Sequence, residues 1–301
     1  SEISSFGESI YFGGGDGYLY SVQADTGRVN WRYAVRNTLV SRPIFSNGRL
    51  FVTAADDTVY AFDAGSGEWI WHYRRRSSPA ATIHGASAPL VIGQQVIVGL
   101  SDGYLVGLSL NDGVLKWEQK LHQGQKFTDV DAEPILNGGV IYVSSYDGSL
   151  YALRKKDRKV IWRFDAGGNK KVVIDGRNLY LSSSLGYVYS LDKKTGKENW
   201  KFELDSGSPT EVTFTEDAVI FGSSFQYLYL VDKKTGKGRY RYNAGYGSGF
   251  RSRPLFHAEK KRLYLLSDSG NFYCFAMRGS QKKRPKGKTD PYRFFLQDVI
   301  R

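Results

Sequence analysis

Cysteine is almost absent from this chain of 301 residues, which has Cys274 as its single thiol. An internal disulfide is therefore excluded, and so are cysteine-rich metal sites, which need several thiolates at fixed spacing. The four histidines are scattered without the spacing of a zinc motif, and no calcium-loop sequence is present. The sequence thus predicts no metal site, while cysteine usage leaves the cellular compartment open.

Long apolar runs and helical periodicity are lacking as well. No segment approaches the roughly 18 consecutive apolar residues of a membrane-spanning helix. The chain begins at Ser1 without an initiator methionine or an apolar leader, so we expect that any targeting segment has been removed. What is abundant is glycine, at 34 residues, together with aromatic residues, at 15% of the chain. This composition favours many short strands joined by tight turns.

A repeated pattern accounts for nearly the whole sequence. In its clearest copy, residues 179–202, two alternating strands are followed by a Thr-Gly turn and a third strand that carries Trp200. A further short apolar segment, often opened by Ser-x-Pro, precedes the pattern. Seven copies of its first strand begin at Ile10, Leu50, Val96, Ile141, Leu179, Val219 and Leu263. Four short strands recurring about every 40 residues are typical of a β-propeller blade.

We therefore predict an all-β fold, namely a seven-bladed β-propeller of four-stranded antiparallel blades, in preference to eight blades. The propeller would comprise residues 1–278, followed by a basic linker at 279–290. In the tail, 291–301, apolar and polar residues alternate, so we expect it to supply the outer strand of the seventh blade.

One aromatic residue recurs on the outermost strand of each repeat. A wide aromatic ring at this place can fill the wedge that opens between neighbouring blades. We predict this structural role for Trp31, Trp71, Trp117, Trp162, Trp200 and Tyr240.

Two connections, at 77–89 and 121–134, depart from the repeat. In the second, Asp129 and Asp131 would point to one side of an extended segment, about 6.6 Å apart. Such a pair could act as general acid and base, receive a partner's arginine, or simply be solvated loop acids. A Gly-x-Ser-x-Gly match at 99–103 is not interpreted as a nucleophile elbow, because a strand and not a helix is expected to follow it.

The net charge is +12, from 42 Lys and Arg against 30 Asp and Glu. This balance favours acidic partners such as an anionic membrane face, an acidic protein or nucleic acid. Because basic residues occur in every repeat, we take a well-solvated basic surface as the simpler interpretation and expect no nucleic-acid binding. An anionic-surface binder stays as an alternative hypothesis.

The repeat pattern, with Asp-Gly, Thr-Gly and Trp at fixed places, resembles PQQ-like propeller repeats over residues 1–278. Residues 84–89, 128–134 and 249–254, with 173–181, resemble more specifically the BamB family of outer-membrane-assembly lipoproteins. The resemblance implies a non-catalytic, periplasmic scaffold without a cofactor, anchored to the outer membrane through a lipidated N-terminus that would have been removed from this chain. It also implies a monomer that docks on the POTRA region of the barrel-assembling subunit.

Carried over by position, the resemblance implies partner contacts at Ala81, Ile83 and His84 in the first connection and at Asp129 and Asp131 in the second. The first of these departs from the family, which has leucine and arginine where this chain has Ala and His. The family also has eight blades and is usually acidic. A quinoprotein enzyme is disfavoured, because the vicinal cysteines and calcium ligands of those dehydrogenases are missing.

A hypothesis of another class is a ligand-sensing or enzymatic propeller that uses its central channel. Arg42, Glu133 and Arg253 occupy equivalent positions at the start of inner strands and are the candidates to line that channel.

Overall fold

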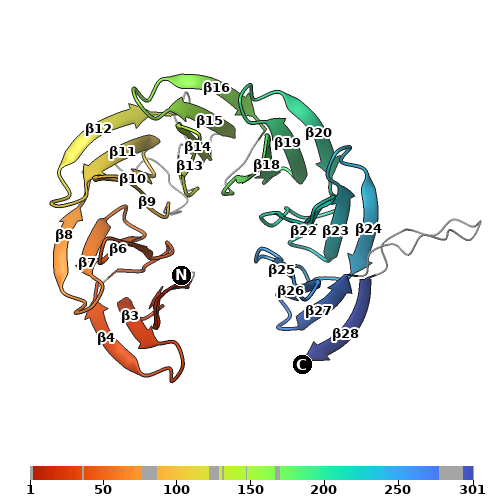
Figure 1. Cartoon of the computed structure of the whole chain (residues 1–301), viewed down its shortest axis with the longest axis horizontal. Coiled ribbons are helices and arrows are strands. Elements are labelled where there is room, and N and C mark those ends of the chain that lie inside the picture. The colour runs from red at the N-terminus through yellow and green to blue at the C-terminus, as the bar shows by residue number, and fades with distance from the viewer. Residues whose placement is uncertain are drawn as a thin grey trace, which may run out of the picture. The chain divides into compact units, whose positions relative to one another are not determined.

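β-Strands, joined by turns and loops, are the only regular elements in the part of the chain that the structure describes. The computed structural model describes residues 3–35, 37–75, 87–121, 129–130, 132–146, 148–166 and 170–277, with the backbone of strand 294–300. The described strands form seven four-stranded antiparallel sheets, so the predicted β-propeller fold is confirmed (Figure 1). Contacts divide the chain into two compact units, Ser1–Asp165 and Ala166–Arg301. Within the described residues, no helix is long and apolar enough to cross a membrane.

The first unit contains four of these sheets, and in each of them strands adjacent in sequence pair with one another. The strands are β1 (Ser4–Phe6), β2 (Ser9–Gly13), β3 (Tyr18–Gln23), β4 (Val29–Ala34), β5 (Ile44–Ser46), β6 (Arg49–Thr53), β7 (Val59–Asp63), β8 (Trp69–Tyr73), β9 (Leu90–Ile92), β10 (Gln95–Gly99), β11 (Tyr104–Ser109), β12 (Leu115–Lys120), β13 (Ile135–Asn137), β14 (Val140–Ser145), β15 (Ser149–Arg154) and β16 (Val160–Asp165).

The second unit contains the other three sheets, built in the same way. Their strands are β17 (Val173–Asp175), β18 (Asn178–Ser183), β19 (Tyr187–Asp192), β20 (Glu198–Glu203), β21 (Thr213–Phe214), β22 (Ala218–Gly222), β23 (Tyr227–Asp232), β24 (Gly238–Asn243), β25 (Leu255–His257), β26 (Arg262–Leu266), β27 (Phe272–Met277) and β28 (Phe294–Ile300). Strand β28 comes from the tail and pairs with β27, with Phe294 opposite Met277 and Ile300 opposite Phe272.

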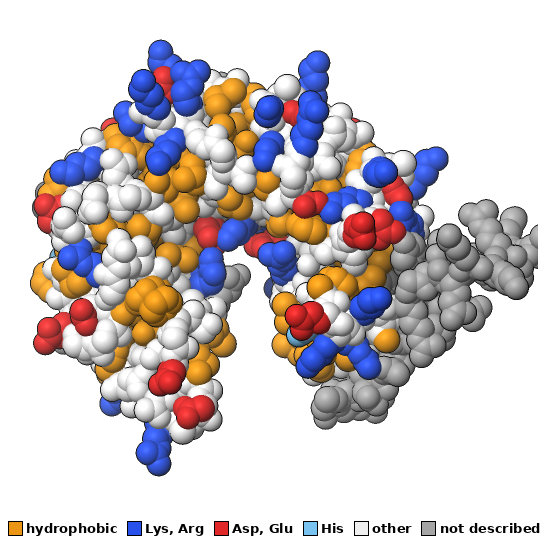
Figure 2. Space-filling view, in the orientation of Figure 1, with side chains coloured by type: hydrophobic (Ala, Val, Ile, Leu, Met, Phe, Trp, Pro, Cys, Tyr) orange, Lys and Arg blue, Asp and Glu red, His pale blue; other side chains and the backbone are white. Residues whose placement is uncertain are grey.

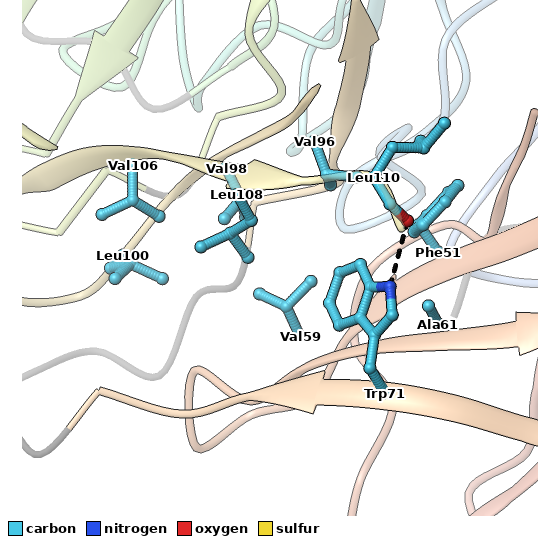
Figure 3. Close-up of a cluster of buried hydrophobic side chains, with 10 residues drawn as sticks. All are labelled: Phe51, Val59, Ala61, Trp71, Val96, Val98, Leu100, Val106, Leu108 and Leu110. Atoms are coloured by element: carbon cyan, nitrogen blue, oxygen red, sulfur yellow. Dashed lines mark hydrogen bonds between the residues drawn. The ribbon is translucent and has the colours of Figure 1, made fainter. Parts of the chain in front are cut away.

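The hydrophobic core of each unit lies between neighbouring sheets. Strands β6 and β7 bury Phe51 and Val59 against Val96, Val106 and Leu108 of the next sheet (Figure 3). Alternation along each strand explains this arrangement, since every second side chain of a strand faces the same neighbour. The alternating apolar side chains of the predicted strands therefore form a series of hydrophobic cores between neighbouring sheets.

Trp71 on β8 joins its own sheet to the next one. Its indole N–H donates a hydrogen bond of 3.0 Å to the carbonyl of Leu110, drawn dashed in Figure 3. The ring lies against Gly113, where an added Cβ would come within 2.5 Å of it, and Gly113 has φ +70. The same two contacts recur for Trp31 with Ala64 and Gly67, and for Trp200 with Lys233 and Gly236.

Trp117 on β12 is arranged differently. Its indole N–H donates to the Gln95 side chain of its own sheet at 2.9 Å. In the following sheet the glycine of the turn is replaced by Arg158, which has φ 60 and places its guanidinium 5.3 Å from the Trp117 ring centroid. Gly107, opposite Trp117 in the ladder, leaves room for the turned ring, because a Cβ there would lie 2.2 Å from it.

The remaining two aromatic residues of this series are placed as follows. Trp162 lies beside Tyr142 of its own sheet, with ring centroids 5.8 Å apart. Tyr240 is half-buried and packs against the core between β21–β24 and β25–β28.

Replacing Gly113 with alanine tests the tryptophan contact. The methyl group would add backbone strain at positive φ and displace Trp71, for a combined loss of about 3 kcal/mol in the free energy of unfolding. Gly93→Ala is the matched control, because Gly93 also has positive φ but no atom lies within 4 Å of its added Cβ. We expect this control to lose only about 1 kcal/mol in urea denaturation. Equal losses would contradict the contact.

Candidate functional site

Both long connections of the first unit start and finish at one end of its sheets. The connection between β8 and β9 leaves at Arg75 and returns at Ser87, and the one between β12 and β13 leaves at Leu121 and returns at Asp129. The hairpins β6–β7 and β10–β11 turn at the same end. We refer to Asp57, Arg75, Ser101, Asp102 and Asp129 together as the connection end.

The second connection is clamped between two sheets where it returns. The Val130 amide donates to the Leu100 carbonyl at 3.0 Å, and the Tyr146 amide donates to the Asp129 carbonyl at 2.7 Å. Val130 also packs on Gly99, where an added Cβ would lie 2.2 Å from the Val130 carbonyl oxygen. Glycine is required at this position by close approach of the connection. The base of the connection is thus a fixed part of the core.

Asp129, a predicted partner-binding residue, is only 1% exposed. The sequence predicts an accessible acid at this position, whereas in this conformation the Asp129 side chain offers a partner no surface. Asp131 lies outside the described residues, and so do Ala81, Ile83 and His84, so that their roles stay predictions.

Asp57 takes the place that glycine has in the equivalent hairpins. Its φ of 62 is in the left-handed region, which Asp tolerates better than most residues. Its carboxylate accepts bonds from the Ser101 amide, at 3.1 Å, and from the Ser101 hydroxyl. Burial raises the pKa of Asp57, the Ser101 bonds oppose this rise, and the charges of Asp102 and Asp129 add to it.

Ser101 is the serine of the Gly-x-Ser-x-Gly match. It lies in the hairpin before β11, so the expected strand follows it and a nucleophile elbow is excluded. Its hydroxyl donates to Asp57. The serine therefore holds two sheets together.

Arg75 neutralises a second pair of acids. Its guanidinium contacts Asp102 at 2.7 Å and Glu118 at 2.6 Å, and it lies 4.2 Å from the ring centroid of Tyr104. Burial raises the pKa of Asp102, and the charge of Arg75 acts against that rise. Arg75 is not among the site residues predicted from the sequence.

Arg75 reaches Tyr104 of the next sheet. A related contact occurs within four other sheets, where a cation of the outer strand faces a tyrosine of the third strand of the same sheet. These pairs are Arg32 with Tyr18, Arg163 with Tyr151, Lys201 with Tyr187, and Arg241 with Tyr227.

The Ser-x-Pro segments link the inner edges of neighbouring sheets. Thr53 donates its hydroxyl to the Ser87 carbonyl at 2.8 Å, and Ser87 donates its hydroxyl to the Ala132 carbonyl at 3.1 Å. In the second unit Ser182 donates to the Thr210 carbonyl at 2.7 Å in the same way. The hydroxyl residues of this motif therefore have a structural role that the sequence did not reveal.

Two of the three candidate channel residues are brought together. Arg42 donates to both carboxylate oxygens of Glu133, each at 3.1 Å. Arg253 belongs to the second unit, where its side chain is exposed just before β25. Since the Arg42 charge is matched by Glu133, this pair gives no specific support to an anion-binding channel.

Both acids of the connection end whose pKa is raised have a partner. Asp57 accepts hydrogen bonds from Ser101, and Asp102 forms an ion pair with Arg75. No group of three or more His, Cys, Asp or Glu able to hold a metal occurs among the described residues.

Comparison with known proteins identifies the family. A family model described as outer membrane protein assembly factor BamB matches residues 1–202 and 186–281. The chain belongs to the BamB family. Curated relatives with the same description include those of Yersinia pestis, 26% identical over 179 residues, and Alkalilimnicola ehrlichii, 34% identical over 103 residues. The first match covers 58% of this chain and 45% of the relative, and the second covers 32% and 27%. The chain thus matches less than half the length of these BamB relatives.

Solved structures agree with the fold. The crystal structure of BamB from Moraxella catarrhalis is similar with a TM-score of 0.77 at 21% identity, over 88% of this chain and 80% of that one. A quinohemoprotein alcohol dehydrogenase from Pseudomonas putida is also similar, with a TM-score of 0.67 at 13% identity, over 92% of this chain and 62% of that one. At these identities the likeness shows the fold alone, for the BamB structure as for the dehydrogenase.

The buried Asp57 predicts a distinctive pH dependence. Because its pKa is raised, the folded state holds its proton more tightly than the unfolded state, whose aspartates titrate near pH ~3.9. Its contribution to the free energy of unfolding therefore falls as pH rises from that value through the folded-state pKa. Asp57→Asn abolishes this pH-dependent loss of stability. The free energy of unfolding of the variant minus that of the wild type should therefore increase with pH.

Asp63→Asn is the control with opposite sign. Bonds from the Ser66 amide and hydroxyl lower the pKa of Asp63, so its stabilisation is present above the unfolded-state pKa and lost as pH falls through the folded-state pKa. The loss in free energy of unfolding caused by Asp63→Asn should therefore become smaller at acidic pH. Urea denaturation at several pH values between about 3 and 7 measures both trends, because this range extends to both sides of the ordinary aspartate pKa. A difference for Asp57→Asn that is independent of pH would contradict its raised pKa.

Proposed function

We propose that this chain is a non-catalytic scaffold of the Gram-negative cell envelope that supports the assembly of outer membrane β-barrel proteins. The match to the BamB family model, which extends to residue 281, carries this proposal. The relatives are named outer membrane protein assembly factors. A periplasmic location at the outer membrane follows from the same proposal.

The proposed partner is the POTRA region of the barrel-assembling subunit, bound by a monomer of this chain. The proposed contact consists of the two long connections, with Asp131 as its acidic residue. Support comes from the way the connections are anchored, since Arg75 is fixed by Asp102 and Glu118, and Asp129 and Val130 by Tyr146 and Leu100. Fixed ends reduce the conformational entropy that a loop loses when it binds.

The absence of catalysis is part of the proposal. Asp57 and Asp102 of the connection end are engaged by Ser101 and Arg75, and Arg42 is engaged by Glu133. Similarity to a quinohemoprotein dehydrogenase is limited to the fold. A scaffold needs only a rigid surface, and the packed sheets with the anchored ends of the connections support this role.

Binding of the purified full chain to a POTRA fragment tests the function and the site. Asp131→Ala should raise the Kd at least about tenfold, as expected when one partner of an interfacial ion pair is lost. Glu68→Ala is the matched control, because Glu68 is exposed at the opposite end of the same unit. We expect its Kd to equal that of the wild type.

Each outcome has a distinct meaning. Unchanged binding by Asp131→Ala would overturn the site while leaving the partner in place. A wild-type chain that does not bind the fragment would overturn the proposed partner. Thermal unfolding of both variants checks that each substitution leaves the fold intact.

A further inference from the structure

The net charge of the chain is confined to one of its two units. Residues 1–165 contain 17 basic and 17 acidic residues, whereas residues 166–301 contain 25 and 13. The whole excess of +12 therefore belongs to the second unit. Basic residues occur in both units, but their excess over acidic residues lies in the second unit alone. A charge asymmetry of this kind indicates an anionic partner.

Within the second unit, the first and third reversals of β17–β20 and of β21–β24, and the first reversal of β25–β28, each lie at the same end of their sheets. Main-chain hydrogen bonds place them side by side, from the Lys193 amide to the Arg177 carbonyl, from Lys233 to Asp217, and from Met277 to Lys261. An ion pair between Lys233 and Asp175 joins this end of two neighbouring sheets. We name as the basic end the exposed Lys194, Lys197, Lys234, Lys237, Lys260 and Lys261.

Several acidic side chains of these turns form hydrogen bonds and ion pairs with residues of their own unit. Asp192 accepts from Arg177 and from the amides of Lys194 and Thr195, which together hold its pKa at about 2. At Asp232, burial acts to raise the pKa. The bonds from Arg239 and the Thr235 amide outweigh burial and lower the pKa of Asp232 to about 2. Glu198, Glu216 and Glu259 remain exposed at this end.

The six lysines of the basic end project outward. Their ammonium groups form no ion pair with any residue in the described part of the chain. Figure 2 shows Lys and Arg side chains standing out around β20 and β24. The sequence between β27 and β28, residues 278–293, adds seven basic residues and one acidic residue to the charge of the unit.

We propose that the basic end binds the surface of an anionic lipid bilayer. Arg177 is exposed at this end as well but is paired with Asp192, whereas the exposed cations of the described turns that form no ion pair are lysines. Lysines act as point charges toward lipid phosphates, and recognition of nucleic acid and proteins favours the planar fork of arginine. The described turns of this end, 175–178, 192–198, 215–218, 232–238 and 257–262, contain no Phe, Tyr or Trp on which bases could stack. The choice of a membrane rests on the proposed envelope function.

Co-sedimentation of the full chain with vesicles tests the proposal. Vesicles with about one third phosphatidylglycerol in phosphatidylcholine should bind the wild type, and pure phosphatidylcholine vesicles should not. Binding should weaken strongly between about 0.01 M and 1 M salt, because the screening length falls tenfold. The triple variant Lys194→Glu, Lys234→Glu, Lys237→Glu should bind roughly 100-fold more weakly, at about fivefold for each cation.

The matched control is Arg28→Glu, Lys116→Glu, Lys120→Glu, which changes three exposed residues of the first unit and lowers the net charge equally, from +12 to +6. It should bind within about threefold of the wild type, since charges beyond a screening length contribute little. Equal loss in both variants would overturn the assignment to the basic end. Salt-independent binding, or equal binding to both vesicle types, would overturn the electrostatic mode.

Two further measurements separate the competing partners. If duplex DNA displaces the chain from the vesicles at concentrations far below the lipid phosphate, the lipid assignment is overturned in favour of nucleic acid. The basic-end variant should retain its affinity for the POTRA fragment. Loss of vesicle binding with retained POTRA binding supports the proposal, whereas failure of wild-type POTRA binding would refute only the proposed function.

Discussion

An indole N–H that reaches from one sheet to a turn carbonyl of the next is the interaction on which the packing of these sheets depends. The hydrogen bond satisfies a carbonyl beside a buried ring, and the ring itself removes about 150–250 Å² from water. At the inner edge, a Thr or Ser hydroxyl donates to the carbonyl of the following sheet, as Thr53 and Ser182 do. Each sheet boundary with both contacts is thus fixed at its outer and inner margins.

The residues that hold the sheets together are therefore separate from the surfaces that differ between repeats. Strands and short turns are occupied by packing, so recognition falls to the long connections and to charged turns. In the first unit, Asp57 and Asp102 of the connection end are matched by Ser101 and Arg75. In the second unit, Asp192 and Asp232 of the lysine turns are bound by backbone amides and arginines, and lysines stand at the surface. The two units therefore offer chemically different surfaces on the same architecture.

The repeats made most of the fold predictable from sequence, because period-2 alternation and recurring turns specify strands locally. The site was less accessible to this reasoning. Asp129 has no counterpart in the other repeats, and its burial depends on contacts with Leu100 and Tyr146 from two different sheets. Arg75 meets Asp102 and Glu118 only after the chain has folded. The charge asymmetry is present in the sequence, but the boundary between its neutral and basic parts, after Asp165, follows from the division of the structure into two units.

Trp117 shows how a repeat can lose a shared contact without losing its packing. Arg158 stands where the other turns have glycine, the indole is turned back toward Gln95, and Gly107 supplies the space that the ring then needs. Neither Gly107 nor Arg158 is explicable alone, since each makes sense only with the ring in this orientation. Over evolutionary time the two positions are therefore expected to covary, so that relatives with glycine at the turn are free to carry a larger residue at the ladder position.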